Sequence, residues 1–294
     1  MKALFIVNPA AGGKDRVRAV TEAVKKVCRG GGGLFVIKST KGPGHAKALS
    51  EEAVRRNFSV VFACGGDGTV NEVAAPLLSR PVVLGIVPLG RGNTLSRSLK
   101  IPLSVEDSVR LIKKWNVRSV DAGVFCDRYF FAMAGFGIEA GFLKKYKKLF
   151  FTGRPKEFLS RHPGAFKEFL KYNEEELHIT VDNAFIKVKS LTLTVANTAY
   201  YGGAAVIAPG ASPFDGHIHL CVLPALSVLK VPDVSQKLFN GTIAELKGYR
   251  HVKGKRIDIP RAHITDAYVD GEHFEWIGDI TVRVLQKKLK VLTP

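Results

Sequence analysis

Residues 60–73 read VVFACGGDGTVNEV, and this stretch decides the fold. Its first four residues are apolar and have the length and β-branched character of a buried strand. Glycines at 65, 66 and 68 then make a turn, and a segment with helical periodicity follows at 69–79. A strand, a glycine turn and a helix in this order are typical of one unit of an α/β domain with a parallel sheet.

Similar units surround this one in the first 116 residues. Apolar runs at 3–7, 34–37 and 82–87 have strand length, and helical periodicity appears at 14–29 and 44–56. Strands that alternate with helices at this spacing predict a mostly parallel sheet that helices cover on both faces. The glycine-containing turns fall on one edge of that sheet, where α/β proteins bind ligands; they lie at 8–14, 40–45, 64–69 and 88–94.

The glycine turn after Cys64 predicts a phosphate site with an acidic residue inside it. Glycines let the backbone approach a ligand closely, and N–H groups at the start of the next helix favour an anion. Thr69 and Glu72 have the spacing of a capping box for that helix. Asp67 would repel a phosphate, by about 4 kcal/mol at about 4 Å and an intermediate dielectric constant, unless a cation lay between them. The turn therefore predicts a site for a Mg²⁺–nucleotide, and a solvated Asp in a glycine turn is the alternative.

The pattern changes after a further predicted helix at 104–115, which Ser104 and Asp107 would cap. Strand-like segments then follow with few helices between them and predict a mainly antiparallel β domain. These segments lie at 118–126, 128–134, 177–182, 185–196, 216–223, 256–259, 264–269 and 280–285. We expect helices near 139–150 and 161–172. The predicted domains are 1–118 and 119–285, and residues 286–294 could return to the first.

The composition fits two domains and an anionic partner. The chain has 294 residues, 46% of them hydrophobic, and a formal net charge of +18, which favours nucleic acid, an acidic membrane surface or phosphorylated ligands. No apolar run reaches the length of roughly 18 residues that a membrane-spanning helix needs. Residues 1–8 predict a strand instead of a signal peptide, so we expect a cytoplasmic protein. The four cysteines show no C-x-x-C spacing and predict core packing in a reducing compartment.

Two common nucleotide motifs are missing, since the chain has no P-loop and no G-x-G-x-x-G at the start of its first helix. The segment GGDGTVNE at 65–72 instead resembles the signature of the diacylglycerol kinase catalytic domain family, whose bacterial members are lipid kinases related to sphingosine kinases. Further segments agree with the family in order and spacing: NPAAG at 8–12, TKGPGHA at 40–46, PLGRGN at 88–93, ASPFDG at 211–216 and VDGE at 269–272. GGDGT alone is less specific, because NAD kinases share it.

The resemblance implies an α/β nucleotide-binding domain and a C-terminal antiparallel β-sandwich domain, with the active site in the cleft between them. It implies that the phosphates of ATP lie over the glycine turns. The residues that would bind ATP are Asn8, Pro9, Ala10, Ala11, Gly12, Thr40, Gly65, Gly66, Asp67, Gly68, Thr69, Asn71, Glu72, Gly90, Arg91 and Asn93.

The resemblance also implies a structural Mg²⁺ at Asp215, with backbone oxygens near Ser212 and His217, in addition to the ion expected at Asp67. It places the catalytic base in the D-G-E segment, at Asp270 or Glu272. On one strand these two side chains would face the same side, so either could be the base. A β-turn at 270–271 is the alternative.

This sequence departs from the family pattern at two positions. Arg91 stands where the family usually has Thr, and Thr94 stands where it often has Asp. The first change adds a permanent cation that could neutralise phosphate directly, and the second removes an acidic group near the metal. The number of metal ions stays open, and we expect activity to be retained.

Other residues have more than one interpretation. The segment 141–151, GFLKKYKKLFF, could lie in an anionic membrane interface or pack on the β domain. His217 and His219 could share a strand face in a transition-metal site, but no third ligand stands at a fixed spacing. Solvated aspartates are ordinary at strand ends and turns, which is our interpretation of Asp121, Asp127 and Asp182.

We therefore predict a lipid kinase that uses MgATP and visits an anionic membrane surface, with diacylglycerol as the default acceptor. Sphingoid bases, monoacylglycerol and phosphatidylglycerol are alternative acceptors. An NAD kinase-like phosphotransferase is disfavoured by the segments 71–72 and 88–98, and a weakly active nucleotide-binding regulatory protein is suggested by Arg91 and Thr94. We expect no nucleic acid partner, because no binding motif is present, and a homodimer stays open.

Overall fold

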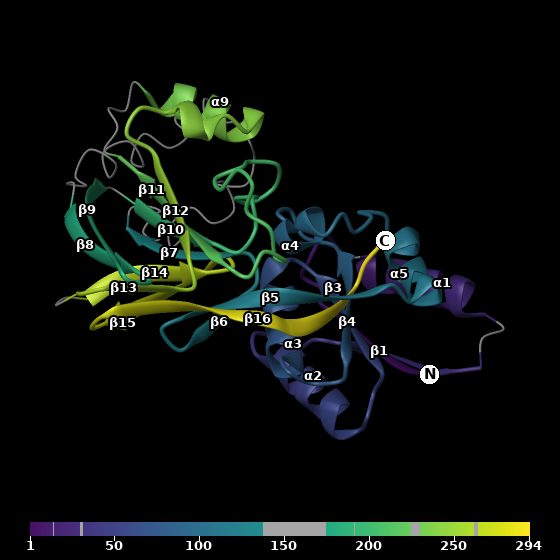
Figure 1. Ribbon diagram of the computed structural model, residues 1–294. Helices are drawn as coiled ribbons and strands as arrows, with labels where there is room; N and C mark the ends of the chain where they lie inside the picture. Colours follow the sequence, from purple (N-terminus) through teal and green to yellow (C-terminus); the bar gives the residue numbers. More distant parts are fainter. Residues whose placement is uncertain (14, 30–31, 138–174, 191, 225–229, 262–263) are drawn as a thin grey trace. The chain divides into compact units, whose positions relative to one another are not determined.

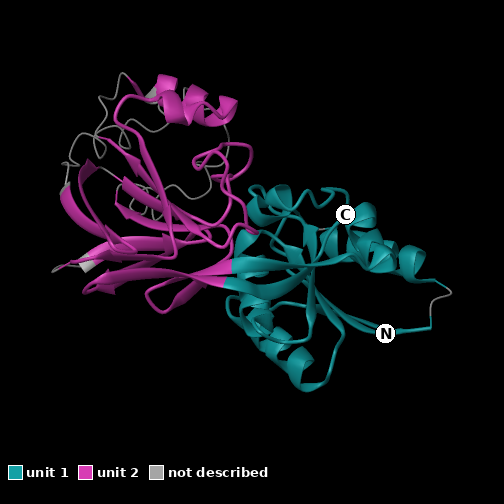
Figure 2. Cartoon of the chain, in the orientation of Figure 1, with its two compact units in different colours: residues 1–121, 286–294 teal, residues 122–285 magenta. Residues whose placement is uncertain are grey.

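The computed structural model describes the chain except for residues 14, 30–31, 138–174, 191, 225–229 and 262–263 (Figure 1). The chain divides into two compact units, residues 1–121 with 286–294 and residues 122–285 (Figure 2). The helices expected at 139–150 and 161–172, and the lysine-rich segment 141–151, lie outside the described residues. Within the described ranges, no helix combines the length and the apolar character that a membrane span requires.

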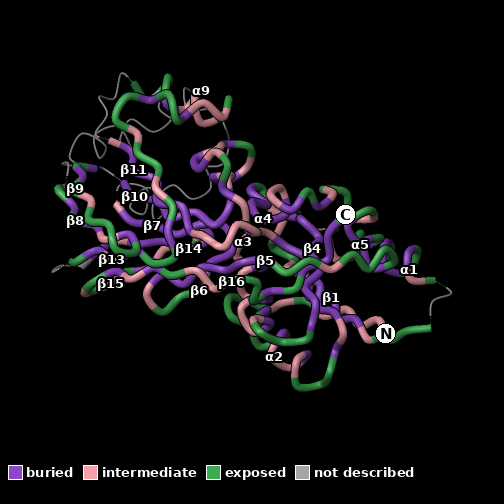
Figure 3. The backbone as a smooth tube through the Cα atoms, viewed as in Figure 1, coloured by how far each residue is buried: buried purple, intermediate pink, exposed green. Residues whose placement is uncertain are grey.

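Unit 1 contains a parallel sheet, as the alternation of strands and helices predicts. Its strands are β1 (Lys2–Val7), β2 (Leu34–Ser39), β3 (Val60–Gly65), β4 (Val83–Pro88) and the last part of β16 (Ile280–Leu292), in the order β2-β1-β3-β4-β16. Neighbouring strands run parallel throughout this order. Every residue of β3 and β4 is buried, which explains why both appear in the sequence as continuous apolar runs (Figure 3).

Helices cover both faces of this sheet (Figure 1). α1 (Arg16–Cys28) packs against α5 (Val105–Lys114) on one face, and α2 (His45–Arg55) packs against α3 (Asp67–Ala74) on the other. A short 3₁₀ helix, η1 (Ala75–Leu77), and the five-residue α4 (Thr94–Ser98) complete the unit. The start of α5 is capped as predicted, because the Ser104 hydroxyl accepts the N–H of Asp107.

Two phenyl rings fill the centre of the unit 1 sheet. Phe5 of β1 and Phe62 of β3 stack with their ring centroids 4.4 Å apart. Gly85 is the register partner of Phe62 on β4, and a Cβ there would overlap the Phe62 ring. The glycine in β4 is therefore required by packing and not by a turn.

Unit 2 is built from antiparallel strands in two sheets. One sheet has the order β12-β11-β10-β7-β14-β15. The other holds β6, β8, β9 and β13, with the last part of β5 (Val117–Phe125) and the first part of β16. The bounds are β6 (Arg128–Phe130), β7 (Met133–Gly137), β8 (Glu175–Val181), β9 (Ala184–Ser190), β10 (Thr192–Ala196), β11 (Ile218–Leu223), β12 (Arg250–Gly254), β13 (Arg256–Ile259), β14 (Ile264–Val269) and β15 (Glu272–Ile277). Helix α9 (Val231–Asn240) and the 3₁₀ helix η3 (Ile243–Glu245) lie between β11 and β12.

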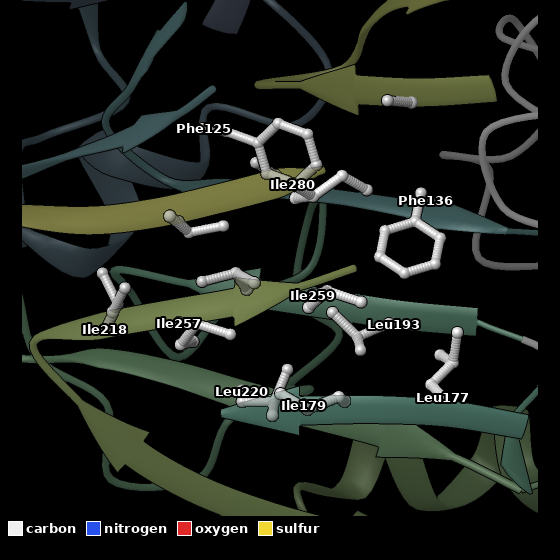
Figure 4. Packing of buried hydrophobic residues seen from close by; sticks show 14 of the residues in the cluster. Phe125, Phe136, Leu177, Ile179, Leu193, Ile218, Leu220, Ile257, Ile259 and Ile280 are labelled. Carbon is white, nitrogen blue, oxygen red and sulfur yellow. The ribbon is translucent and has the colours of Figure 1, made fainter. Parts of the chain in front are cut away.

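The two sheets of unit 2 share one apolar core. Ile179 and Ile257 from one sheet and Leu193 and Leu220 from the other belong to a single buried cluster (Figure 4). A second buried cluster joins the six-stranded sheet to α9 through Tyr268 and other residues. Burial on both faces makes this sheet the middle layer of the unit, which agrees with the predicted β-sandwich class.

Two predicted strands are each divided in two. The segment 128–134 covers β6 and the first two residues of β7, and the segment 185–196 covers β10 and all of β9 except its first residue. Strands β12 and β15, the edge strands of the six-stranded sheet, were not predicted. Edge strands carry exposed charged residues and therefore give a weaker apolar signal.

The interpretation of Asp121 as a solvated residue is wrong. Its side chain lies within β5 and is only 1% exposed. Asp121 Oδ1 accepts the N–H of Lys287, at 2.7 Å, where β16 has a residue in the left-handed region with φ +53°. A buried carboxylate that accepts a backbone N–H in this way stabilises an irregularity of the sheet.

Candidate active site

Glycine turns of unit 1 fit closely against one another. The N–H of Leu89 donates to the carbonyl of Gly65 at 2.9 Å. A Cβ on Gly90 would lie 2.5 Å from the Cα of Gly66, and a Cβ on Gly12 would lie 2.6 Å from the Leu89 carbonyl oxygen. Side chains at these positions would push the turns apart, so the glycines are required by the contacts between them.

Asn8 joins the first turn to the glycine turn after β3. Its N–H donates to the Cys64 carbonyl at 2.9 Å, and its side-chain Nδ2 donates to Thr69 Oγ1 at 2.9 Å. Its Oδ1 accepts the N–H of Ala10 at 3.0 Å. Asn8 and Thr69 thus bind each other, which fixes the side chain of Thr69 away from the capping role that the sequence predicted.

The predicted capping box of Thr69 and Glu72 is wrong. Helix α3 begins at Asp67, two positions before Thr69, and its N-cap Gly66 has no side chain to offer. The first intrahelical bond runs from the N–H of Val70 to the Gly66 carbonyl. The N–H groups of Gly68 and Thr69 lie in the first turn of α3, where they have no intrahelical acceptors, and such groups favour an anion.

The carboxylate of Asp67 has a structural role in the glycine turn, because it accepts backbone N–H groups of a second turn. Its Oδ1 accepts the N–H of Thr94 at 2.6 Å, and its Oδ2 accepts the N–H of Asn93 at 2.9 Å. A Cβ on Gly92 would lie 2.5 Å from Asp67 Oδ2, so that position also needs a glycine. Burial raises the pKa of the Asp67 carboxyl, and the donors from Thr94 and Asn93 oppose the increase. The carboxylate holds the start of α4 within unit 1.

Asn93 completes this arrangement. It lies in the left-handed region with φ +50° at the N-cap of α4. Its side chain forms a pair of hydrogen bonds with the backbone of Gly90, from Gly90 N–H to Oδ1 at 3.0 Å and from Nδ2 to the Gly90 carbonyl at 2.8 Å. Asn93 therefore shapes the turn 88–93 and presents its N–H to Asp67.

Whether Asp67 can bind a divalent ion directly depends on how many lone pairs of its carboxylate are still available. Two backbone N–H groups and the Thr94 hydroxyl already donate to the carboxylate. A carboxylate has about four lone-pair positions, so little room remains for a metal on its oxygens. Asp67 fits an ion that is bound through water better than one bound directly.

The other predicted nucleotide residues lie at the same edge of the unit 1 sheet, where the parallel strands end. Thr40 follows β2, and its N–H donates to the Val7 carbonyl at 2.9 Å, next to Asn8. Asn71 and Glu72 lie in the second turn of α3 and are half-buried. Exposed members of the set are Pro9, Ala10, Gly12 and Arg91.

Unit 2 places Asp270 and Glu272 in different settings. Asp270 lies in a two-residue turn with Gly271, between β14 and β15, and its φ is +45°. Val269 and Glu272 are register partners across this hairpin. The expectation that Asp270 and Glu272 face one side of one strand is therefore wrong, because the chain reverses between them.

The carboxylate of Asp270 binds a loop of the backbone. Its Oδ2 accepts the N–H of Phe131 at 2.9 Å, and its Oδ1 accepts the N–H groups of Ala132 at 2.9 Å and Met133 at 3.1 Å. Asp270 is 8% exposed, whereas Glu272 is exposed. Asp270 thus holds the segment between β6 and β7 against the β14–β15 hairpin.

Asn197 holds the same segment from another strand and was not predicted. It is fully buried, its Nδ2 donates to the Phe131 carbonyl at 2.8 Å, and its N–H donates to the Ala132 carbonyl at 2.8 Å. The sequence signal is weak, because an Asn directly after a strand-like segment such as 192–196 is common in turns. Asp270 and Asn197 together fix the backbone at 131–133.

Asp215 lies in a turn before β11. Its Oδ1 accepts the N–H of His217 at 2.9 Å, and its Oδ2 accepts the N–H of Ser212 at 3.3 Å and lies 2.9 Å from His219 Nε2. These three donors leave about one lone-pair position on the carboxylate, as at Asp67, so a hard cation in this turn would be held mainly by carbonyl oxygens and through water. No group of three or more His, Cys, Asp or Glu side chains in the described parts of the chain is arranged to hold a metal.

Comparison with known proteins assigns the family. The sequence profile of the diacylglycerol kinase catalytic domain matches residues 2–125, and that of the YegS C-terminal NAD kinase beta sandwich-like domain matches residues 135–293. A probable lipid kinase YegS-like of Yersinia pestis (strain Pestoides F) is 34% identical over 248 residues, which cover 81% of this chain and 79% of that protein. The chain belongs to the YegS-like lipid kinase family. A YegS-like protein of Yersinia pseudotuberculosis serotype O:1b (strain IP 31758) has the same identity and coverage.

Solved structures agree with the fold of this YegS-like lipid kinase. A putative diacylglycerol kinase from Bacillus anthracis str. Sterne has a TM-score of 0.77 and 24% identity, with 100% of this chain and 97% of that chain covered. A second diacylglycerol kinase structure from the same organism has a TM-score of 0.74 and 21% identity over the same shares. The predicted fold class, an α/β domain followed by an antiparallel β domain, is confirmed. Membership in a kinase family implies phosphotransferase chemistry with ATP and usually a divalent metal.

Proposed function

We propose that this YegS-like lipid kinase transfers the γ-phosphoryl group of MgATP to the hydroxyl of diacylglycerol and so forms phosphatidic acid. The observation that carries the proposal is the close fit of the glycine turns in unit 1, with Gly90 against Gly66 and Gly12 against Leu89. Such turns bring backbone N–H groups near a ligand without side chains in between. Phosphoryl transfer needs this kind of positioning and charge neutralisation more than covalent chemistry.

The proposed nucleotide contacts follow from the placement of the donors. The N–H groups of Gly68 and Thr69, at the start of α3, would bind phosphate oxygens. Thr40 would add its hydroxyl from the end of β2, and Arg91 would add a cation from the turn 88–93. These groups lie on the C-terminal edge of the sheet, where α/β domains bind ligands.

The proposed metal sites use the residues described above. Mg²⁺, when bound, would neutralise charge on the transferred phosphoryl group. Asp67 would hold this ion through water, because backbone donors already occupy its oxygens. A structural ion would be held by Asp215 and by backbone oxygens near Ser212 and His217.

The proposed catalytic base is Glu272 and not Asp270. A base must have a lone pair that can accept the proton of the acceptor hydroxyl. Asp270 is buried and already accepts three backbone N–H groups. Glu272, at the first position of β15, has an exposed side chain. Asp270 would then position the segment 131–133 instead of reacting.

The lipid acceptor suggests that the protein works at an anionic membrane surface. The formal net charge of +18 favours such a surface, and the lysine-rich segment 141–151 is the proposed point of contact.

The experiment that tests the proposal offers several acceptors to the full chain. Radiolabelled ATP and Mg²⁺ are incubated with micelles of diacylglycerol, monoacylglycerol, phosphatidylglycerol or a sphingoid base, and separately with NAD. We expect label in phosphatidic acid above all other products. Label in another lipid would correct the acceptor, and label in NAD alone would overturn the lipid kinase proposal.

Replacement of Arg91 by Thr is expected to raise the KM for ATP about tenfold, because a charge-assisted hydrogen bond to phosphate contributes roughly 1.5–3 kcal/mol. Steady-state kinetics at varied ATP would measure the change. Arg80→Thr is the matched control, because it removes an exposed cation before β4, at the opposite end of the strand that Arg91 follows. Equal KM values for wild type and Arg91→Thr would exclude a direct phosphate contact.

A further inference from the structure

The side chain of Glu72 does not point to the glycine turn from which its helix starts. Its Oε1 accepts the N–H of Gly44 at 2.9 Å, and its Oε2 accepts the N–H groups of Ala46 at 3.1 Å and Lys47 at 3.4 Å. These groups form the N-terminus of α2, which precedes α3 in the chain. Glu72 therefore caps a helix other than its own.

Within the described parts of the chain, Glu72 supplies the side-chain cap of α2 that the helix's own N-cap residue lacks. Its N-cap is Gly44, in the left-handed region with φ +78°, and no side chain of the helix bonds to the first N–H groups. The first N–H groups of any helix lack intrahelical acceptors and carry partial positive charge. A carboxylate is the side chain best suited to satisfy them, and α3 supplies it.

The loop before α2 is tied at both ends. At its start, the N–H of Thr40 donates to the Val7 carbonyl at 2.9 Å. Within it, the N–H of Lys41 donates to His45 Nδ1 at 2.9 Å. At its end, Glu72 holds Gly44 and the next turn. The position of the Thr40 loop therefore depends on β1 and on α3.

We propose that Glu72 is a positioning residue that holds the Thr40 loop at a fixed place relative to the first turn of α3. This inference rests on the proposed function, in which Thr40 and the N–H groups of Gly68 and Thr69 bind the same nucleotide. Glu72 lies one turn after Gly68 on α3 and has both carboxylate oxygens committed to α2. It acts on ATP through the loop and does not touch ATP. The N-terminus of α2, already occupied by Glu72, does not bind phosphate.

The test compares two links between the same helices. Glu72→Ala removes the link at the Thr40 loop, and Ser50→Ala removes a buried link farther along α2, where Ser50 Oγ donates to the Val73 carbonyl at 2.7 Å. We expect Glu72→Ala to raise the KM for ATP about tenfold with kcat changed less than about twofold, since a bond to a charged group contributes enough for that factor. Ser50→Ala should lower the melting temperature and leave the KM unchanged.

Glu72→Gln provides a rescue. Its amide oxygen can still accept from Ala46 and Lys47, so we expect the KM to rise only about two- to threefold, less than for a full loss of the bonds. A KM for ATP that stays at the wild-type value in Glu72→Ala would overturn the proposal. So would an equal rise in Ser50→Ala, because any loosening of the two helices would then be sufficient.

Amide hydrogen exchange without ATP separates this inference from the proposed function. The N–H groups of Gly44, Ala46 and Lys47 should exchange faster in Glu72→Ala than in wild type, and Ser50→Ala should leave them protected. Unchanged exchange at these amides would overturn the proposal that Glu72 holds the Thr40 loop. If the amides respond but wild type fails to bind ATP in a direct titration, the proposed function is wrong. The structural role of Glu72 in holding the Thr40 loop would still stand.

Discussion

Replacement of Asp67 by Asn is expected to lower turnover by at least about 100-fold and to leave the protein folded, because one preorganised charged group in an active site is commonly responsible for such a factor. Asn has nearly the shape of Asp and keeps one acceptor oxygen. It can therefore still receive an N–H from Asn93 or Thr94 and hold the start of α4. What it loses is the negative charge that we propose for Mg²⁺.

Stability should not follow activity in this variant. Burial raises the pKa of the Asp67 carboxyl, so the folded chain binds this proton more tightly than the unfolded chain. The stability from this group is present below its ordinary pKa and is lost as the pH rises through the folded value. The ionised form of this buried carboxylate is therefore the form that disfavours folding, and a neutral Asn avoids that cost. This gain opposes the loss of an acceptor for one of the two backbone N–H groups, so the melting temperature of Asp67→Asn should fall far less than turnover does.

The measurements are kcat, the melting temperature, and ATP binding by titration calorimetry with Mg²⁺ and with EDTA. Glu52→Gln is the control, since it removes a half-buried carboxylate of α2 that pairs with Lys38 and Arg56, and it should leave turnover unchanged. Wild-type turnover in Asp67→Asn, together with equal ATP binding in EDTA, would contradict the role of Asp67 and of the metal.

The parallel sheet of unit 1 could be predicted because its signals are local. The apolar runs that became β1, β3 and β4 are buried on both sides, and each leads into a turn that contains glycine. Ser104 and Asp107 lie three residues apart and bond to each other, so their capping interaction was visible in the sequence. Features of this kind can be predicted from a short segment of sequence.

The partners of the acidic residues could not be predicted, because they are distant in sequence. Asp67 bonds to N–H groups 26 and 27 residues later, and Glu72 bonds to groups 25 to 28 residues earlier. Thr69 and Glu72 match the capping-box spacing, but Asn8 takes the Thr69 hydroxyl and α2 takes the Glu72 carboxylate. The residue types at 69 and 72 match a capping box, but the predicted hydrogen bonds between them are absent from the described structure. Tertiary contacts decide which donors each side-chain oxygen accepts.

Two further elements carry weaker signals in the sequence. Helix α9 has Pro232 in its first turn and Gly241 at its end with φ +74°, which is the usual asymmetry of helix termini. Strand β15 is an edge strand in which buried Phe274 lies between half-buried His273 and exposed Glu275. The five-residue α4 is too short for periodicity to reveal. Its start depends on Asp67, which the sequence alone does not place.

Substitutions at Asp270 and Glu272 are expected to affect different properties. Asp270→Ala leaves three N–H groups of a buried segment without their acceptor, each at about 1–3 kcal/mol, so the free energy of unfolding should fall by about 3 kcal/mol or more. For a domain of this size that corresponds to a melting temperature lower by roughly 6–12 °C. Glu272→Gln should leave the melting temperature unchanged, because the Glu272 side chain is exposed.

Turnover should depend directly on Glu272 and only indirectly on Asp270. Loss of a general base lowers kcat by roughly 10²–10⁴-fold, and we expect this for Glu272→Gln. Glu275→Gln is the matched control, because Glu275 is an exposed residue of the same strand with its side chain on the other face. Both are measured with saturating ATP and diacylglycerol micelles, beside calorimetric unfolding.

The near-isosteric Asp270→Asn decides between the two carboxylates. If Glu272 is the base, Asp270→Asn should lose activity only to the extent that it loosens the segment 131–133, and that loss should diminish at lower temperature, where the native segment is more fully populated. If Asp270 is the base, Asp270→Asn should be inactive at every temperature while Glu272→Gln works normally. The second outcome would require Asp270 to give up one of its three backbone hydrogen bonds during each turnover, which its buried position in the hairpin opposes.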